Sequence, residues 1–192
     1  IRVREEFSLP TIFVSHDVTE MRLLCREMLI LEKGKVVACG PAAQVAFEAS
    51  LHPAFRDEGF ENVLRGRVVQ EKESGLLLEL EKGYTILVPR GEKARLATVM
   101  VGLRAEDILI SLGTPAGLSA QNSLRGTVRE IRSLSVDQAT DSPVWVTVVY
   151  GGQGASLVAS ITPQACSRLS LAEGKEVDLI FKAQSCRILA AG

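Results

Sequence analysis

The sequence predicts a mainly β fold: two related small barrels that follow a short α/β segment. Beyond about residue 60, short runs of β-branched and aromatic residues alternate with glycine, proline and charged turns, which is typical of small β-barrels. The run Asn62-Val63-Leu64-Arg65-Gly66 returns as Asn122-Ser123-Leu124-Arg125-Gly126, which indicates an internal repeat. Residues 1–59 instead combine strand patterns with helical periodicity.

Each half of the repeat has room for five short strands, a number that suits a closed barrel of the OB type. Arg104-Ala105 with Ile108-Leu109 can also be laid on Lys182-Ala183 with Ile188-Leu189. Thr162-Pro163 predicts the start of one short helix. We therefore expect three parts: an α/β piece with a linker (1–59), a first lobe (60–113) and a second lobe (114–192). The expected strands are 63–69, 76–80, 85–88, 98–103 and 107–111 in the first lobe, and 126–131, 145–150, 156–161, 176–181 and 186–189 in the second.

The first 59 residues predict a buried strand at 11–14, a helix over 18–28, a hairpin from 29 to 39 and a helix over 42–48. The run Phe13-Val14-Ser15-His16-Asp17, followed by Leu31-Glu32-Lys33-Gly34-Lys35-Val36 and Gly40-Pro41, resembles the C-terminal end of an ABC transporter ATPase domain. This resemblance implies that His16 is the switch histidine that contacts the γ-phosphate of ATP. The alternative for His16 is a residue that only caps a turn.

Other motifs of that ATPase family are absent from the chain. It contains no glycine-rich lysine loop for phosphates, no ABC signature and no acidic strand end for magnesium. We therefore expect the chain to be part of a longer protein and to hydrolyse no ATP by itself. ATP and magnesium would bind only to the full-length protein, and no intrinsic cofactor is expected here.

Ser119-Ala120-Gln121-Asn122 and the distant pair Lys182-Ala183 together supply a hydroxyl, carboxamides, backbone N–H groups and an ammonium, without a carboxylate. That set of donors suits a small oxyanion, because turn N–H groups accept anions and charge-assisted hydrogen bonds are the stronger ones.

Three segments, Leu118–Ile131, Ala159–Pro163 and Leu171-Ala172-Glu173-Gly174 followed by Phe181-Lys182-Ala183, resemble the molbindin family of molybdate-binding domains. The resemblance implies a molybdate or tungstate ligand, held between two subunits of a homodimer. Gln121 stands where the family usually has arginine, so we expect weakened binding. The implied ligand residues are Ser119, Ala120, Gln121, Asn122, Thr162, Lys182 and Ala183.

The first lobe lacks this pattern. Gly59 stands at the position of Ser119, and Glu61 stands at the position of Gln121. A carboxylate repels an anion, and Arg104 in place of the lysine cannot compensate alone. We therefore predict that no oxyanion binds at the equivalent place in the first lobe.

Together the two resemblances imply the C-terminal regulatory portion of the ATPase subunit of a molybdate importer. Its partners would be a second copy and the permease subunits, on the cytoplasmic face of the plasma membrane. The alternatives are a dimerisation scaffold that binds no oxyanion, and the ATPase of an importer for another substrate such as sulfate or a sugar. A net charge of −1 and the lack of clustered basic residues argue against nucleic acid.

Four cysteines form no C-x-x-C pair and have no metal-ligand spacing with the two histidines. We therefore expect reduced thiols and no metal site.

Overall fold

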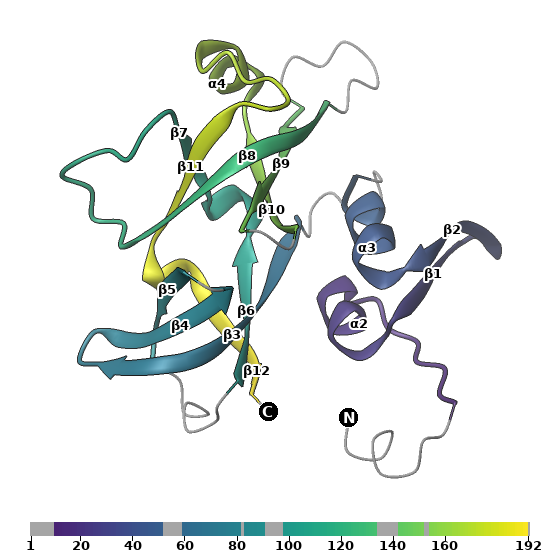
Figure 1. The fold of residues 1–192 in the computed structure, drawn as a ribbon. Helices are drawn as coiled ribbons and strands as arrows, with labels where there is room; N and C mark the ends of the chain where they lie inside the picture. Colours follow the sequence, from purple (N-terminus) through teal and green to yellow (C-terminus); the bar gives the residue numbers. More distant parts are fainter. Residues whose placement is uncertain are drawn as a thin grey trace. The chain divides into compact units, whose positions relative to one another are not determined.

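The structure is a computed structural model that describes residues 10–51, 59–81, 83–90, 98–133, 142–151 and 154–191. Contacts divide the chain into two compact units, Ile1–Gly59 and Phe60–Gly192. Figure 1 shows the fold of each, and the units are described separately below.

The first unit contains helix α2 (Val18–Leu24), the antiparallel hairpin β1 (Glu27–Glu32) with β2 (Lys35–Pro41), and helix α3 (Ala42–Leu51). Asp17 caps α2 by accepting a hydrogen bond from the N–H of Glu20 at 2.9 Å. The hairpin and α3 appear where the sequence predicts them, whereas α2 ends before the expected position because Cys25 is already extended. A small core joins the hairpin to α3: Met28, Ala42, Val45 and Ala46.

The expected strand over residues 11–14 is wrong for this structure. No strand is assigned there, and Ile12 and Val14 are 94% and 89% exposed. A strand needs a neighbour for its backbone groups, and among the described residues of this unit the sheet consists of β1 and β2. The apolar run predicts a strand from composition, but composition does not supply the neighbouring strand.

The second unit contains two five-stranded antiparallel sheets, which confirms the mainly β, OB-like prediction. The first sheet has the order β12-β6-β3-β4-β5, and the second has the order β7-β11-β8-β9-β10. A short helix, α4 (Pro163–Arg168), follows β10 as predicted. The strand bounds are β3 (Glu61–Lys72), β4 (Gly75–Glu81), β5 (Tyr84–Val88), β6 (Thr98–Arg104), β7 (Leu109–Ser111), β8 (Asn122–Ser133), β9 (Val144–Tyr150), β10 (Ala155–Ile161), β11 (Glu176–Phe181) and β12 (Cys186–Ala191).

The two lobes exchange their last strands, so the sheets do not follow the expected boundary at residue 113. Strand β7, from the first lobe, pairs with β11 of the second, and β12 pairs with β6 of the first. Each exchange follows a 3-10 turn, η2 (Ala105–Asp107) or η3 (Ala183–Ser185). One continuous core therefore joins both lobes, with Leu64 and Leu124 among its buried residues.

Strand pairing defines how the two halves correspond. Val63 pairs with Gly102 as Ser123 pairs with Ile180, so β3 maps onto β8 with an offset of 60 and β6 onto β11 with an offset of 78. The offset of 78 continues through the exchanged strands, since Cys186 pairs with Leu103. Ile108 therefore corresponds to Cys186, and the predicted match of Ile108 with Ile188 is wrong by two residues.

Candidate functional site

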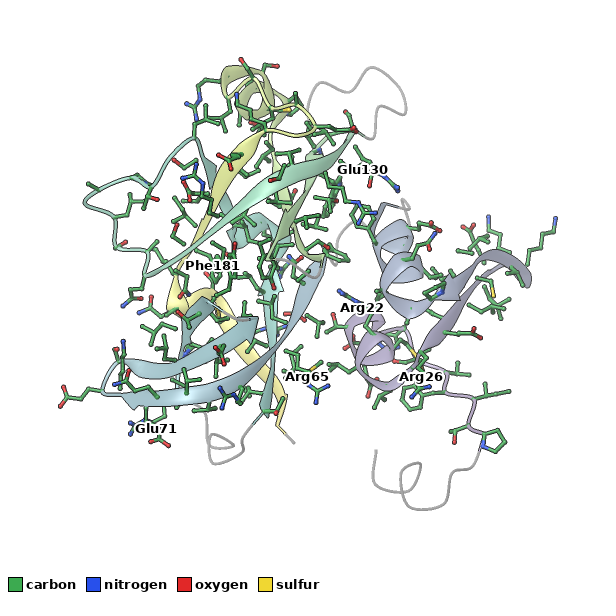
Figure 2. All side chains as sticks on the ribbon, in the orientation of Figure 1. Arg22, Arg26, Arg65, Glu71, Glu130 and Phe181 are labelled. Carbon is green, nitrogen blue, oxygen red and sulfur yellow. The ribbon has the colours of Figure 1, made fainter. Side chains whose placement is uncertain are left out.

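Pairing of β8 with β11 brings two predicted site segments together. Asn122, the first residue of β8, pairs with Phe181, the last residue of β11. The chain before Asn122 is Ser119–Gln121, and the chain after Phe181 is Lys182-Ala183, so both segments leave the same end of the sheet. Phe181 is buried in the core and is labelled in Figure 2. We call Ser119–Gln121 with Lys182–Gln184 the open end.

The backbone ladder stops earlier here than at the corresponding place in the first lobe. In the first lobe, Glu61 pairs with Arg104 and the N–H of Ala105 donates to the carbonyl of Phe60 at 2.8 Å. Within the described residues, no hydrogen bond involves the corresponding N–H of Ala183, although this residue is only 4% exposed. A buried N–H without a partner is uncommon in proteins. The backbone N–H of Ala183 is therefore available to donate a hydrogen bond to a ligand.

The charged side chains of the two equivalent ends also differ in whether they have partners. Arg104 forms an ion pair with Glu106, at 2.7 Å between Nε and Oε1. At the open end, Lys182 replaces Arg104 and Gln184 replaces Glu106. Lys182 is exposed and forms no ion pair within the described residues. Its positive charge is therefore not balanced by the neighbouring turn.

A second carboxylate at the first-lobe end, that of Glu61, is also paired within the chain. Glu61 is 8% exposed and accepts hydrogen bonds from Nε and Nη2 of Arg187, a residue of the exchanged strand β12. Its carboxylate lies over Gly102, where an added Cβ would be 2.5 Å from Oε1. Gln121 and Leu109 occupy the corresponding positions of Glu61 and Arg187 at the open end. Glu61 and Glu106 of the first lobe thus correspond to the neutral amides Gln121 and Gln184 of the second.

The carboxamide of Asn122 contacts the first lobe. Its side chain is 3% exposed, its Oδ1 accepts from the N–H of Leu87 at 2.7 Å, and its Nδ2 donates to the carbonyl of Leu87 at 2.9 Å. These bonds direct the carboxamide toward β5 of the first lobe. The carboxamide of Asn122 is therefore held by the first lobe, a contact that the sequence did not predict, and its role toward a ligand stays a prediction.

Thr162 is not brought to the open end within one chain. Its Oγ1 caps α4 by accepting from the N–H of Ala165 at 3.1 Å. Ile161, which precedes it, and Ser133 both pair with Val144, so Thr162 follows the end of β8 opposite to Asn122. Eleven residues of strand separate the two ends, roughly 35 Å along β8, with α4 at the far end (Figure 1).

His16 belongs to the other unit. It is exposed and lies in the turn that leads into α2, where the N–H of Asp17 donates to Oγ of Ser15 at 3.1 Å. The described residues around it form the hairpin and two helices of that unit, and they include none of the phosphate-binding motifs.

The described residues contain no group of three or more histidine, cysteine or acidic side chains that could hold a metal ion. All four cysteines are free thiols. Among the described helices, none is long and apolar enough to span a membrane.

Sequence reasoning missed Gln184, and it missed the ion pairs of Glu106 and Arg187. The signal was present in the repeat. The constant offset of 78 places Gln184 opposite Glu106, but the shifted match of Ile108 with Ile188 concealed it.

Comparison with known families now supplies a name for the second lobe. Residues 118–188 match the TOBE domain. This stretch contains the open end and α4, and it ends inside the exchanged strand β12.

Curated relatives match nearly the whole chain. The molybdenum import ATP-binding protein ModC of Mesorhizobium japonicum is 36% identical over 96% of this chain and 48% of its own length. The protein of the same name from Rhodopseudomonas palustris strain HaA2 is 31% identical over 92% of this chain and 46% of its own length. The predicted resemblance to molybdate importer ATP-binding subunits is confirmed, and the chain spans about half the length of these relatives.

A solved structure agrees with the fold. The cytoplasmic molybdate-binding protein ModG, crystallised with molybdate bound, aligns with a TM-score of 0.55 and 26% identity. The alignment covers 66% of this chain and 94% of that one. The predicted resemblance to molybdate-binding β-barrels is confirmed.

Proposed function

We propose that the chain is the C-terminal regulatory portion of the ATP-binding subunit of a molybdate or tungstate importer, and that it binds the oxyanion at the open end. Support comes from the ModC relatives, from the TOBE match over 118–188 and from the molybdate-bound ModG structure.

One contrast carries the proposal. At the first-lobe end, the backbone N–H of Ala105 and the side chains of Arg104 and Glu61 all have partners inside the chain. At the open end, the N–H of Ala183 and the ammonium of Lys182 have none within the described residues. The two equivalent turns therefore differ in whether their donors already have partners inside the chain. The turn whose donors are paired belongs to the first lobe, which the sequence predicts to bind no oxyanion.

The chemistry of the ligand fits the open donors. Molybdate is a tetrahedral dianion that keeps its own oxygens, so its site needs hydrogen-bond donors and positive charge and needs no metal ligands. Lys182 supplies charge, while Ser119, Gln121 and the backbone of Ala120 and Ala183 supply donors. Gln121 donates through a neutral amide, and such a bond contributes about 1 kcal/mol less than a charge-assisted one.

Thr162 can contribute only from a second copy, because it lies at the other end of its own sheet. We therefore propose a homodimer in which Thr162 of one copy approaches the open end of the other. Such an arrangement closes donors around the anion from two sides and makes dimerisation and binding mutually dependent.

In the full-length protein, ATP and magnesium would bind to the ATPase domain, where His16 acts as the switch histidine, and permease subunits would hold the complex at the cytoplasmic face of the membrane. Oxyanion binding regulates hydrolysis if the anion prefers one arrangement of the ATPase domains. The test is the ATPase rate of the full-length transporter with increasing molybdate, with sulfate as the control. Regulation is supported if molybdate changes the ATPase rate and if this response is lost in Lys182→Ala. A rate unaffected by molybdate refutes it.

The second candidate function is a dimerisation scaffold that binds no oxyanion. Gln121 favours it, because it provides no positive charge where the resemblance leads us to expect arginine. A dimer that forms equally well with and without molybdate, and that gives no heat on titration, would favour the scaffold.

A further inference from the structure

Two asparagines at equivalent positions cap the edge strands of opposite sheets. Asn122 binds both the N–H and the carbonyl of Leu87 on β5, the edge strand of the first sheet. Asn62 binds the N–H and the carbonyl of Val158 on β10, the edge strand of the second sheet, at 2.8 and 2.9 Å. An edge strand exposes unpaired backbone groups, and each carboxamide satisfies one donor and one acceptor of that kind.

The two caps differ in what lies beside them. Asn122 is the residue directly after Ser119–Gln121, and η3, which follows Lys182, also packs against β5. Both segments of the open end therefore rest on the same strand of the first lobe. Asn62 stands at the first-lobe end, where Glu61 and Arg104 already have partners.

We propose that Asn122 is a positioning residue for the oxyanion site and that β5 of the first lobe is the support on which that site is assembled. The ligand part of this inference rests on the function proposed above. The first lobe, in which Ala105, Arg104 and Glu61 already have partners at the equivalent end, thereby contributes to binding in the second.

The physical reason is the cost of unpaired backbone groups. Asn122→Ala leaves the N–H and carbonyl of the half-buried Leu87 without their side-chain partners, and an unpaired donor or acceptor that is shielded from water is costly. The segment before β8 then loses its attachment to β5, and Ser119–Gln121 no longer holds a fixed distance from Lys182. Asn62→Ala removes the corresponding cap at the first-lobe end, where the carboxamide also donates to the carbonyl of Leu103 at 3.1 Å. Because that end lies away from Ser119–Gln121 and Lys182, Asn62→Ala is the control for a general loss of stability.

Two measurements on the chain separate positioning from general stability. The first is titration with molybdate at a temperature well below both unfolding midpoints. Asn122→Ala weakens binding about tenfold, which corresponds to about 1.4 kcal/mol, while Asn62→Ala changes it less than about twofold. The second is hydrogen exchange of the ligand-free protein at the first residues of β8, whose pairing with β11 begins at Asn122 and Phe181. Asn122→Ala speeds this exchange and Asn62→Ala does not. If Asn122→Ala does not fold, Asn122→Ser keeps an acceptor for Leu87 and takes its place.

Equal losses of affinity in both variants, or unchanged affinity in Asn122→Ala, would overturn the proposal. If the unmodified chain binds no molybdate, the proposed ligand is wrong, and the exchange measurement still decides whether Asn122 positions the segment. Exchange at the first residues of β8 that is the same in all three proteins would then refute the positioning role.

Discussion

Replacing Lys182 by alanine is the most informative perturbation of the open end, because an equivalent cation exists for comparison. Arg104 occupies the same position in the first lobe and is already paired with Glu106 at 2.7 Å. Lys182 forms no ion pair within the described part of the chain. We therefore predict that Lys182→Ala weakens molybdate binding and that Arg104→Ala does not.

The magnitude follows from the geometry. A charge-assisted hydrogen bond contributes about 1.5–3 kcal/mol, and Lys182 is exposed, so water competes for its ammonium. We take the lower end of the range, which predicts a loss of about tenfold in affinity. Arg104 and Glu106 are both about half exposed, and such a pair contributes about 0–1 kcal/mol to stability. Arg104→Ala should therefore lower stability slightly and change molybdate affinity by less than about twofold.

The assay is titration calorimetry of the unmodified chain and both variants in the same buffer, with urea unfolding to confirm that each is folded. Equal effects of the two substitutions on affinity would refute the reasoning, because they would show that the pairing of Arg104 with Glu106 is irrelevant to binding. A Lys182→Ala variant with unchanged affinity would refute it as well.

Three further predictions concern affinity, packing and pH. Gln121→Arg should tighten molybdate binding about five- to tenfold by replacing a neutral hydrogen bond with a charge-assisted one; unchanged or weaker binding in calorimetry contradicts this. Gly126→Ala should lower the free energy of unfolding by about 3 kcal/mol, because its Cβ would lie 2.5 Å from the carbonyl oxygen of Val149. Gly66→Ala should cost less, because the nearest contact of its Cβ is 3.0 Å. Equal losses for the two variants in urea unfolding would contradict this. Burial, and secondarily the charge of Asp107, raises the pKa of Cys186 from 9.0 to about 12. The unfolded thiol therefore ionises first, and stability falls by about 1.4 kcal/mol per pH unit from about pH 9 toward 12, a slope absent from Cys186→Ala; parallel pH curves for the two proteins exclude it.

Some of the fold could be predicted from local signals. The repeat of Asn-x-Leu-Arg-Gly has a physical basis in the structure: the leucines are core residues, the glycines allow close approach of a neighbouring strand, and the asparagines cap edge strands. The proline after Thr162 marks the helix start correctly. These features depend on residues close together in sequence, so a single sequence reveals them.

Long-range pairing could not be predicted in the same way. The exchange of β7 and β12 depends on which sheet edge each strand meets. The amino-acid composition of these two strands is equally compatible with either lobe. The resemblance implies that Asn122 contacts the ligand, but it does not reveal that the carboxamide binds Leu87, a residue 35 positions earlier in the chain. Thr162 matched a motif by sequence order, but the order along the chain does not reveal which end of the sheet a residue occupies.

The first experiment to perform is isothermal titration of the chain with molybdate, with sulfate as the control. We expect saturable binding of one molybdate per open end, no response to sulfate, and a loss of binding in Lys182→Ala. Absence of heat together with absence of thermal stabilisation at millimolar molybdate would contradict the central claim, and the two lobes would then serve as a scaffold without an oxyanion.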